Sequence, residues 1–321
     1  MTTIKNLILL LALLTTSYVE SATKTIELAG EKVPVVEGGL YDQYRSNPPL
    51  SVIAEQAPSV DLSWFKTIKK QKVDMGFESY SPNFYYKNSK ITAVFSADLD
   101  VLTSLIPASV LEHVEPISLW PGRGLVAITA YAYHYCDNDT YNELAISVIT
   151  TKPDSWNLGV ISLLNNQWND DFWGVVLKLP VDTELARVRG VVGYNLPKWT
   201  TKISYKNTPK TLTFSLFDNA TNQPDVIITG KKLSDESTDE KFVRNSFMNH
   251  NQQGQLTTGY ADNRYLRYAS STSDEDVSLE LRQGELSQFI RSLDLGSMIK
   301  YEYVPNFQSA LYAPTYFKAK P

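Results

Sequence analysis

The sequence is poor in the residues that crosslink proteins or hold metals. Its 321 residues include one cysteine, Cys136, and three histidines. One cysteine excludes an internal disulfide, so the fold must depend on its core for stability. His113, His134 and His250 show no metal-ligand spacing, which argues against a metal site. Gly122–Gly124 is too short for a phosphate-binding loop, and no Gly-x-Ser-x-Gly nucleophile elbow occurs.

The sequence also has no large excess of positive or negative residues and no long apolar run. The formal net charge is −5 with acidic and basic residues intermixed, which gives no electrostatic footprint for nucleic acid. The apolar run Leu7–Leu14 is far shorter than the ~20 residues of a membrane-spanning helix. We therefore expect neither a nucleic-acid partner nor a membrane span.

The run Leu7–Leu14 follows a basic residue and precedes small residues at Val19–Ser21, which is the pattern of a cleaved export signal. We predict that residues 1–22 are this signal and that the mature chain is secreted or periplasmic. Protein recovered from the secretory compartment should have a mass that corresponds to a start near Ala22 or Thr23. Recovery of the full-length chain from the cytosol would contradict this prediction.

The rest of the chain is rich in tyrosine, with 19 residues, and in short β-branched and aromatic segments that favour strands. Helices are predicted from Asp98 to Leu105 and, with an amphipathic pattern, over 279–295. The segments expected as strands are 91–95, 124–135, 141–150, 175–181, 211–217, 226–229 and 300–304. This indicates a mainly β, α+β fold, and the pattern alone does not choose between a barrel and a sandwich.

Residues 23–80 differ from the rest and are predicted to be an N-terminal extension of the main domain, residues 81–321. Two short apolar segments, 25–28 and 33–36, suggest a hairpin at the start of the extension. The polar segment 231–241 is expected to be a solvated surface loop. The extension carries no recognisable chemistry, so we expect it to pack on the main domain or to make subunit contacts.

The stretch Leu185–Trp199 contains a candidate nucleophile, Lys198. Pro197 has a fixed φ and holds Leu196 extended, so the lysine is presented at a defined angle. Leu196 and Trp199 are expected to exclude water, and desolvation favours a neutral amine. A neutral lysine can attack a ketone and form a Schiff base, which then acts as an electron sink.

The residues after this lysine leave a second interpretation open. Alternation of polar and apolar residues from 198 to 206 predicts one strand with Lys198, Lys202 and Lys206 on the same face. A solvated lysine on an outer strand face is the commoner meaning of such a pattern.

Glu143 is the candidate acidic residue. It follows the turn after the 124–135 strand, so the two strands are expected to form a hairpin. On the second strand Glu143 shares a face with Ala145 and Ser147, and small residues beside a carboxylate suit a pocket wall. An exposed glutamate at a strand end is the alternative.

These segments resemble the acetoacetate decarboxylase family. Gly190, Tyr194 and Pro197-Lys198 match the glycine, the aromatic and the Pro-Lys pair of its active-site segment. Tyr141–Glu143 resembles its Tyr-x-Glu segment, and 95–111 resembles its opening strand, helix and turn. The resemblance implies a closed, cone-like antiparallel β-barrel, a Schiff-base lysine at Lys198 with Glu143 beside it, no metal or organic cofactor, and a homo-oligomer.

The sequence also departs from the family. Trp199 stands where the archetypal enzyme has a second lysine, Val191-Val192 replace Arg-Glu, Asn195 replaces a glycine, and Asn88 occupies the position of an arginine. The basic residues that could replace this arginine in holding a substrate carboxylate are Lys87, Lys90, Arg123, Arg187 and Arg189. The residues predicted to bind substrate are Tyr141, Tyr194, Leu196, Trp199 and Arg189.

Three functions fit this sequence. The first is a cofactor-independent lyase that decarboxylates a small β-keto acid through Lys198, with Glu143 positioning substrate or managing a proton. The second is a Schiff-base aldolase-dehydratase acting on another carbonyl compound, which the loss of the Arg-Glu pair favours. The third is a non-catalytic exported barrel that binds a small carbonyl compound.

Overall fold

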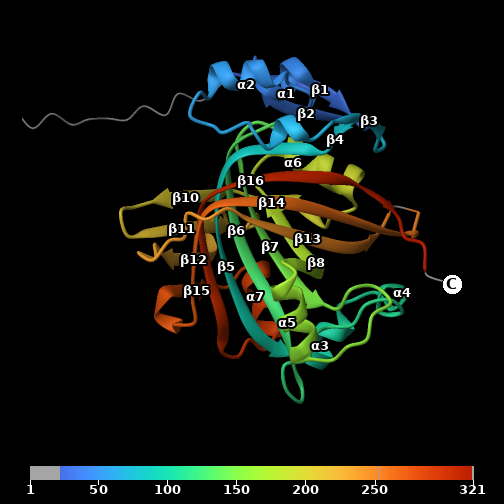
Figure 1. Ribbon diagram of the computed structural model, residues 1–321, viewed down its shortest axis with the longest axis vertical. Helices are drawn as coiled ribbons and strands as arrows, with labels where there is room; N and C mark the ends of the chain where they lie inside the picture. The colour runs from blue at the N-terminus through green and yellow to red at the C-terminus, as the bar shows by residue number, and fades with distance from the viewer. Residues whose placement is uncertain (1–21, 252, 320–321) are drawn as a thin grey trace, which may run out of the picture.

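The computed structural model describes residues 22–251 and 253–319, so the predicted export signal lies outside the described residues except for Ala22. Strands dominate the chain (Figure 1). No helix in the described ranges is long and apolar enough to cross a membrane.

The centre of the molecule is a closed β-barrel, as the resemblance implied. In the order in which they pair, its strands are β13 (Lys241–His250), β14 (Leu256–Ser271), β16 (Met298–Tyr316), β5 (Asn83–Asp98), β6 (Arg123–Cys136), β7 (Tyr141–Thr150) and β8 (Asp171–Val181). Neighbouring strands are antiparallel, except where β8 and β13 close the ring through a short parallel ladder. This ladder runs from Asp171 to Gly174 on β8. Further along the same edge, β8 pairs in parallel with β9 (Lys198–Thr200).

A second sheet packs against the outside of the barrel. Its strands are β10 (Ile203–Asn207), β11 (Thr211–Phe217), β12 (Pro224–Lys231) and β15 (Val277–Leu281). The largest apolar cluster lies between the two layers and includes Ile128 and Ile146 of the barrel, Phe214 and Ile228 of the second sheet, and Ile290 of α7 (Glu285–Ser292). Where the second sheet covers the barrel, outward side chains of strands such as β6 and β7 therefore form the apolar core.

The predicted hairpin of β6 and β7 is confirmed, and its alternation decides which side chains face inward. Leu144, Ile146 and Val148 are buried in the core between the sheets, whereas Glu143 faces the barrel interior together with small residues. Asp139 makes the connecting turn with a φ of +63°. This conformation is tolerated by aspartate better than by most residues.

Short helices connect the strands. They are α3 (Leu99–Ser104), α4 (Ala108–Leu111), α5 (Val160–Trp168), α6 (Glu184–Val188), the π-helix η2 (Arg189–Gly193) and the 3₁₀-helix η3 (Asp274–Asp276). The predicted cap of α3 is confirmed, because the Asp98 carboxylate accepts a hydrogen bond from the Val101 amide. Helices α3 and α5 lie at one end of the barrel (Figure 1).

The N-terminal segment covers the other end of the barrel (Figure 1). It consists of β1 (Thr23–Leu28), β2 (Glu31–Val36), α1 (Leu40–Tyr44), α2 (Leu50–Gln56), the 3₁₀-helix η1 (Phe65–Thr67), β3 (Gln71–Asp74) and β4 (Glu78–Ser81). Strands β1 and β2 form the predicted hairpin. Val33 and Val35 of that hairpin pack on the same apolar cluster as Leu196, directly beside the predicted nucleophile.

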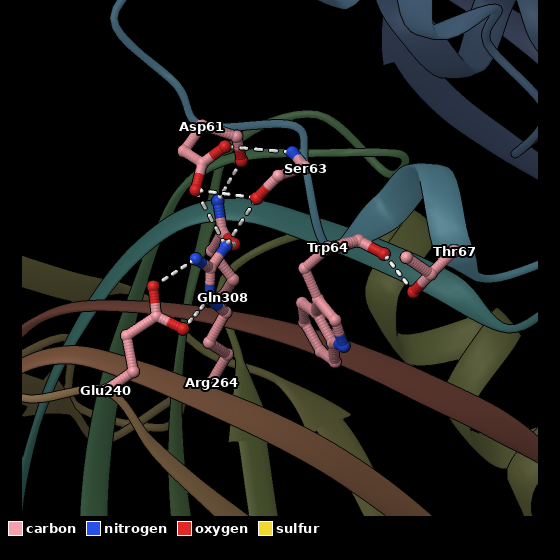
Figure 2. Close-up of polar contacts among 7 residues, drawn as sticks. All are labelled: Asp61, Ser63, Trp64, Thr67, Glu240, Arg264 and Gln308. Carbon is pink, nitrogen blue, oxygen red and sulfur yellow. Dashed lines mark hydrogen bonds and ion pairs between the residues drawn. The ribbon is translucent and has the colours of Figure 1, made fainter.

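Arg264 of β14 attaches this segment to the barrel (Figure 2). Its guanidinium lies 2.9 Å from the Asp61 carboxylate, 3.1 Å from the Gln308 side-chain oxygen and against the carboxylate of Glu240. Gln308 in turn donates to the Asp61 carbonyl at 2.7 Å. The planar guanidinium supplies several donors in fixed directions, so one side chain joins three parts of the chain.

The predicted boundaries of one strand and of one helix are wrong. Residues 198–206 do not form one strand, because the chain leaves the barrel at Thr201 and Lys202 and continues in the second sheet. The Thr201 amide still bonds to Val181 of the barrel, whereas the Lys202 carbonyl already accepts from Phe217 of the second sheet. The helix predicted over 279–295 is confined to α7, because the preceding residues alternate as a strand that pairs with β12.

Candidate active site

The barrel encloses a cavity of about 300 Å³. Inward side chains of the seven barrel strands form its wall, and Leu163 and Gln167 of α5 contribute from one end. The volume lies at the lower limit of small-molecule sites, which run from roughly 300 to 1,000 Å³. The lining mixes apolar side chains with a few ionisable ones, so a ligand inside would be oriented by few polar contacts.

Lys198 lines this cavity from β9. Its backbone lies opposite Leu179 of β8. The preceding turn is held by hydrogen bonds from the Leu196 amide to the Gly190 carbonyl at 3.0 Å and from the Lys198 amide to the Leu196 carbonyl at 2.8 Å. Pro197 stands between them, where no backbone donor is needed. The lysine is therefore anchored on both sides before its side chain leaves the strand.

The Lys198 ammonium forms a buried ion pair with Glu143. Lys198 Nζ lies 2.5 Å from Glu143 Oε2, and the two side chains are 6% and 8% exposed. The other carboxylate oxygen accepts a 3.2 Å hydrogen bond from the Tyr133 hydroxyl. The ammonium also lies 5.7 Å from the ring centre of Tyr141, within the range of a cation–π interaction. The fold thus joins the two residues that the sequence singled out for chemistry.

Three tyrosines form an aromatic wall beside the ion pair. The rings of Tyr85, Tyr133 and Tyr141 have centroids 4.6 to 6.4 Å apart, and the Tyr85 and Tyr141 hydroxyls are 3.1 Å apart. Burial raises the pKa of all three phenols well above its usual value, and the negative charge of Glu143 adds to this rise. At neutral pH they are therefore uncharged hydroxyl groups that can donate or accept hydrogen bonds.

The backbone before Lys198 leaves room for its side chain. A Cβ added at Gly190 would lie 2.6 Å from Lys198 Cε, so the lysine passes directly over this glycine. Asn195 has a φ of +56°, which asparagine tolerates better than most residues. Its side chain donates to Thr257 and its carbonyl accepts from Asn249. An asparagine can therefore stand where the family has a glycine.

Solved structures share this architecture. The acetoacetate decarboxylase of Legionella pneumophila aligns over 74% of this chain and 87% of its own, with 15% identity and a TM-score of 0.52. The enduracididine biosynthesis enzyme MppR aligns over 74% and 88%, with 11% identity and a TM-score of 0.53. The chain has an acetoacetate decarboxylase-like fold. No family model and no curated protein matches its sequence, so the likeness is one of structure.

The acetoacetate decarboxylase-like barrel brings some predicted substrate-binding residues to the cavity and not others. Tyr141 and Leu196 line it, whereas Tyr194, Trp199 and Arg189 are not among its lining residues. Trp199 alternates with Lys198 along β9, so it points to the core outside the barrel. Tyr194 is buried in the apolar cluster beneath the N-terminal hairpin.

Arg189 is directed to the N-terminal segment rather than to the cavity. It is fully buried, donates to Ser79 at 3.2 Å and to Asn83 at 3.1 Å, and lies over the rings of Tyr41 and Phe77. The turn of η2 places Arg189 away from Lys198, although only a few residues separate them. Its position is that of an anchor for the N-terminal segment.

Of the five basic residues considered for a substrate carboxylate, Lys90 alone lines the cavity. Lys87 is exposed, Arg123 pairs with Asp294, and Arg187 pairs with Glu184. Lys90 contacts Glu302 of β16 at 3.1 Å. Sequence reasoning missed Glu302, although it belongs to the predicted strand 300–304 and shares a face with Lys300.

Gly190→Ala tests the passage of Lys198 over the glycine. The added methyl group meets the flexible end of the lysine, so the fold should persist while the amine moves away from Glu143. We expect the rate of imine trapping with acetone and borohydride to fall by about 10², the effect of an ångström-scale misplacement. Gly193→Ala is the matched control, because its methyl group would meet Met75 and Phe77 instead. Equal rates in both variants would contradict this role of Gly190.

Proposed function

We propose that this protein is a Schiff-base-forming lyase that decarboxylates a β-keto acid with Lys198 as the nucleophile. The observation that carries the proposal is the buried contact of 2.5 Å between Lys198 and Glu143 on the wall of the barrel cavity. An isolated buried charge is very costly, so an ammonium in such a place requires a partner or a function. The acetoacetate decarboxylase-like fold supports the same assignment.

The reaction needs only the lysine and a proton carrier. The Lys198 amine adds to the ketone carbon, and water leaves to form an iminium ion. The bond between the α-carbon and the carboxylate then breaks, CO₂ departs, and its electron pair moves into the iminium to give an enamine. The enamine takes a proton at carbon, and water hydrolyses the resulting iminium to release the ketone product and the free lysine.

Glu143 is the group placed to move protons in this sequence. Lys198 must lose a proton before it attacks, and the Glu143 carboxylate is in direct contact with it. The protonated carboxyl can return that proton to the departing hydroxyl or to the enamine. The Tyr133 hydroxyl holds the second carboxylate oxygen, so the first remains directed at the amine.

Aldol condensation followed by dehydration is the second candidate, because it begins with the same imine. One observation favours it: Val191 and Val192 stand where family decarboxylases have Arg-Glu, and Val192 packs on the apolar cluster under the N-terminal hairpin. MppR has been solved with the condensation product of pyruvate and imidazole 4-carboxaldehyde. Release of CO₂ from β-keto acids separates decarboxylation from this candidate.

Borohydride trapping tests the nucleophile. Incubation with a ketone or β-keto acid and then borohydride should add one ligand mass to the peptide that contains Lys198. Lys202 and Lys206 are exposed and serve as internal controls that should stay unlabelled. Lys198→Arg keeps a positive charge without a usable amine, so it should abolish trapping and turnover together. Labelling of Lys202 or Lys206 with Lys198 untouched would refute the assignment.

Glu143→Gln tests the proton carrier. Glutamine keeps the shape of the side chain but cannot accept the lysine proton, so turnover should fall by ~10²–10⁴. The neutral amide leaves the buried ammonium unpaired, and melting should be followed in parallel by circular dichroism. Turnover within a few-fold of the wild type would show that Glu143 is not required for the reaction.

A further inference from the structure

A second lysine–glutamate pair faces the same cavity and has no part in the reaction described above. Lys90 Nζ lies 3.1 Å from Glu302 Oε2, with the lysine side chain 6% and the glutamate side chain 19% exposed. Glu302 also accepts a 3.3 Å hydrogen bond from the Tyr265 hydroxyl. Burial opposes ionisation of Glu302, but the positive charges of Lys90 and Lys300 hold its pKa below its usual value. Burial lowers the pKa of Lys90, and the negative charge of Glu302 opposes this lowering. Glu302 is therefore ionised at neutral pH and lies in contact with the lysine.

The two pairs stand on neighbouring parts of one wall. Lys90 of β5 is opposite Tyr131 of β6, and Tyr131 is opposite Glu143 of β7. Two strand spacings place the backbones of Lys90 and Glu143 about 10 Å apart, with the Tyr131 side chain between them in the cavity. A ligand whose carbonyl meets Lys198 can therefore reach toward Lys90 with its other end.

The cavity wall carries an excess of positive charge in a protein that is acidic as a whole. Four lysines line it, Lys90, Lys198, Lys241 and Lys300, against two glutamates, Glu143 and Glu302. Lys198 is balanced by Glu143, so the excess lies at the Glu302 end. Part of it is offset by Asp170, which contacts Lys241 from outside the lining. A concave surface with this balance of charges favours an anionic ligand group.

Stability alone does not account for the Lys90–Glu302 pair. Desolvating two charges costs several kcal/mol per ion, and replacing a buried pair by apolar residues is often neutral or stabilising. Lys90 has three donors, and Glu302 is the one carboxylate in contact with it among the described residues. A ligand carboxylate can therefore approach the same ammonium without displacing Glu302.

We propose that the Lys90 end of the cavity binds a second carboxylate of the substrate, one that is retained in the product. The substrate class is then a β-keto dicarboxylic acid, in which one carboxylate leaves as CO₂ at Lys198 and the remote one stays at Lys90. The product is a keto acid with a distant carboxylate. This inference rests on the proposed Schiff-base function for the carbonyl end, whereas the anion site at Lys90 can be measured by itself.

The first experiment compares two ketones of equal chain length at Lys198. The probes are oxohexanoate, a methyl ketone with a terminal carboxylate, and methyl butyl ketone, its uncharged counterpart. In the wild type, half-maximal borohydride trapping should need at least about tenfold less oxohexanoate than methyl butyl ketone. Lys90→Met should remove this preference without weakening trapping of the neutral ketone, and Lys206→Met, an exposed control, should preserve it. An unchanged preference in Lys90→Met would overturn the proposal.

The second experiment does not depend on imine formation. Hexanoate, which has no ketone that could form an imine, is titrated into the wild type, Lys90→Met and Lys206→Met, and its binding is followed by calorimetry. Binding should weaken at least about tenfold in Lys90→Met only. The double variant Lys90→Met/Glu302→Gln removes both charges, so it decides the matter if the single variant fails to fold, and it should lose binding to the same extent.

The two experiments separate the two proposals. If the wild type traps neither ketone but binds hexanoate in a Lys90-dependent manner, the Schiff-base function fails and the anion site stands. If both ketones are trapped equally well and hexanoate does not bind, the function stands and the anion site is wrong. Hexanoate binding that is equal in the wild type and in the double variant would also overturn the anion site.

Discussion

The contact between the Lys198 ammonium and the Glu143 carboxylate is the interaction on which the rest of the site depends. Both side chains are nearly fully buried, and removing one partner of a buried ion pair is strongly destabilising. Their strands are not neighbours, since β8 lies between β7 and β9. The pair therefore requires a closed wall of the correct curvature, an extended turn at Pro197 and a glycine at 190 over which the lysine can pass. The lysine amine reaches the carboxylate only when all three features are present together.

Successive side chains of a barrel strand point alternately to the outer core and to the cavity, so different residues serve stability and the candidate site. Outward residues such as Ile128 and Ile146 join the core beneath the second sheet, so the inward face is free to carry tyrosines and charges. The N-terminal segment closes one end, held by the Arg264 network and by Arg189. The apolar core outside the barrel thus stabilises the fold, and the inward positions can carry polar side chains.

Sequence reasoning reached the hairpin of β6 and β7 and the inward face of Glu143, because strand alternation and turn residues are local signals. The placement of Lys198 beside Glu143 came from the family resemblance and not from the local pattern. Sequence reasoning misplaced Arg189, because the partners of this side chain, Ser79 and Asn83, belong to segments about 100 residues earlier in the chain that no local pattern connects with it. It also missed the exit of the chain at Thr201, where the alternation of polar and apolar residues continues although the strand changes sheet. It missed the partner of Lys90 because β5 pairs with β16, a segment far away in the sequence, and such a pairing has no local signature.

The edge of β8 that faces β13 and β9 carries two short parallel ladders with an interruption between them. β8 pairs with β13 only as far as Gly174 and with β9 only from Leu179, so that edge carries no ladder between them among the described pairings. Hydrogen bonds outside the ladders bridge this interruption, because the Asn195 side chain donates to Thr257 of β14 and its carbonyl accepts from Asn249 of β13. The turn that leads into Lys198 is thus fixed to the strands on one side of the interruption, while the lysine side chain contacts Glu143 of β7 on the other. The position of the amine therefore depends on both sides of the barrel wall at once.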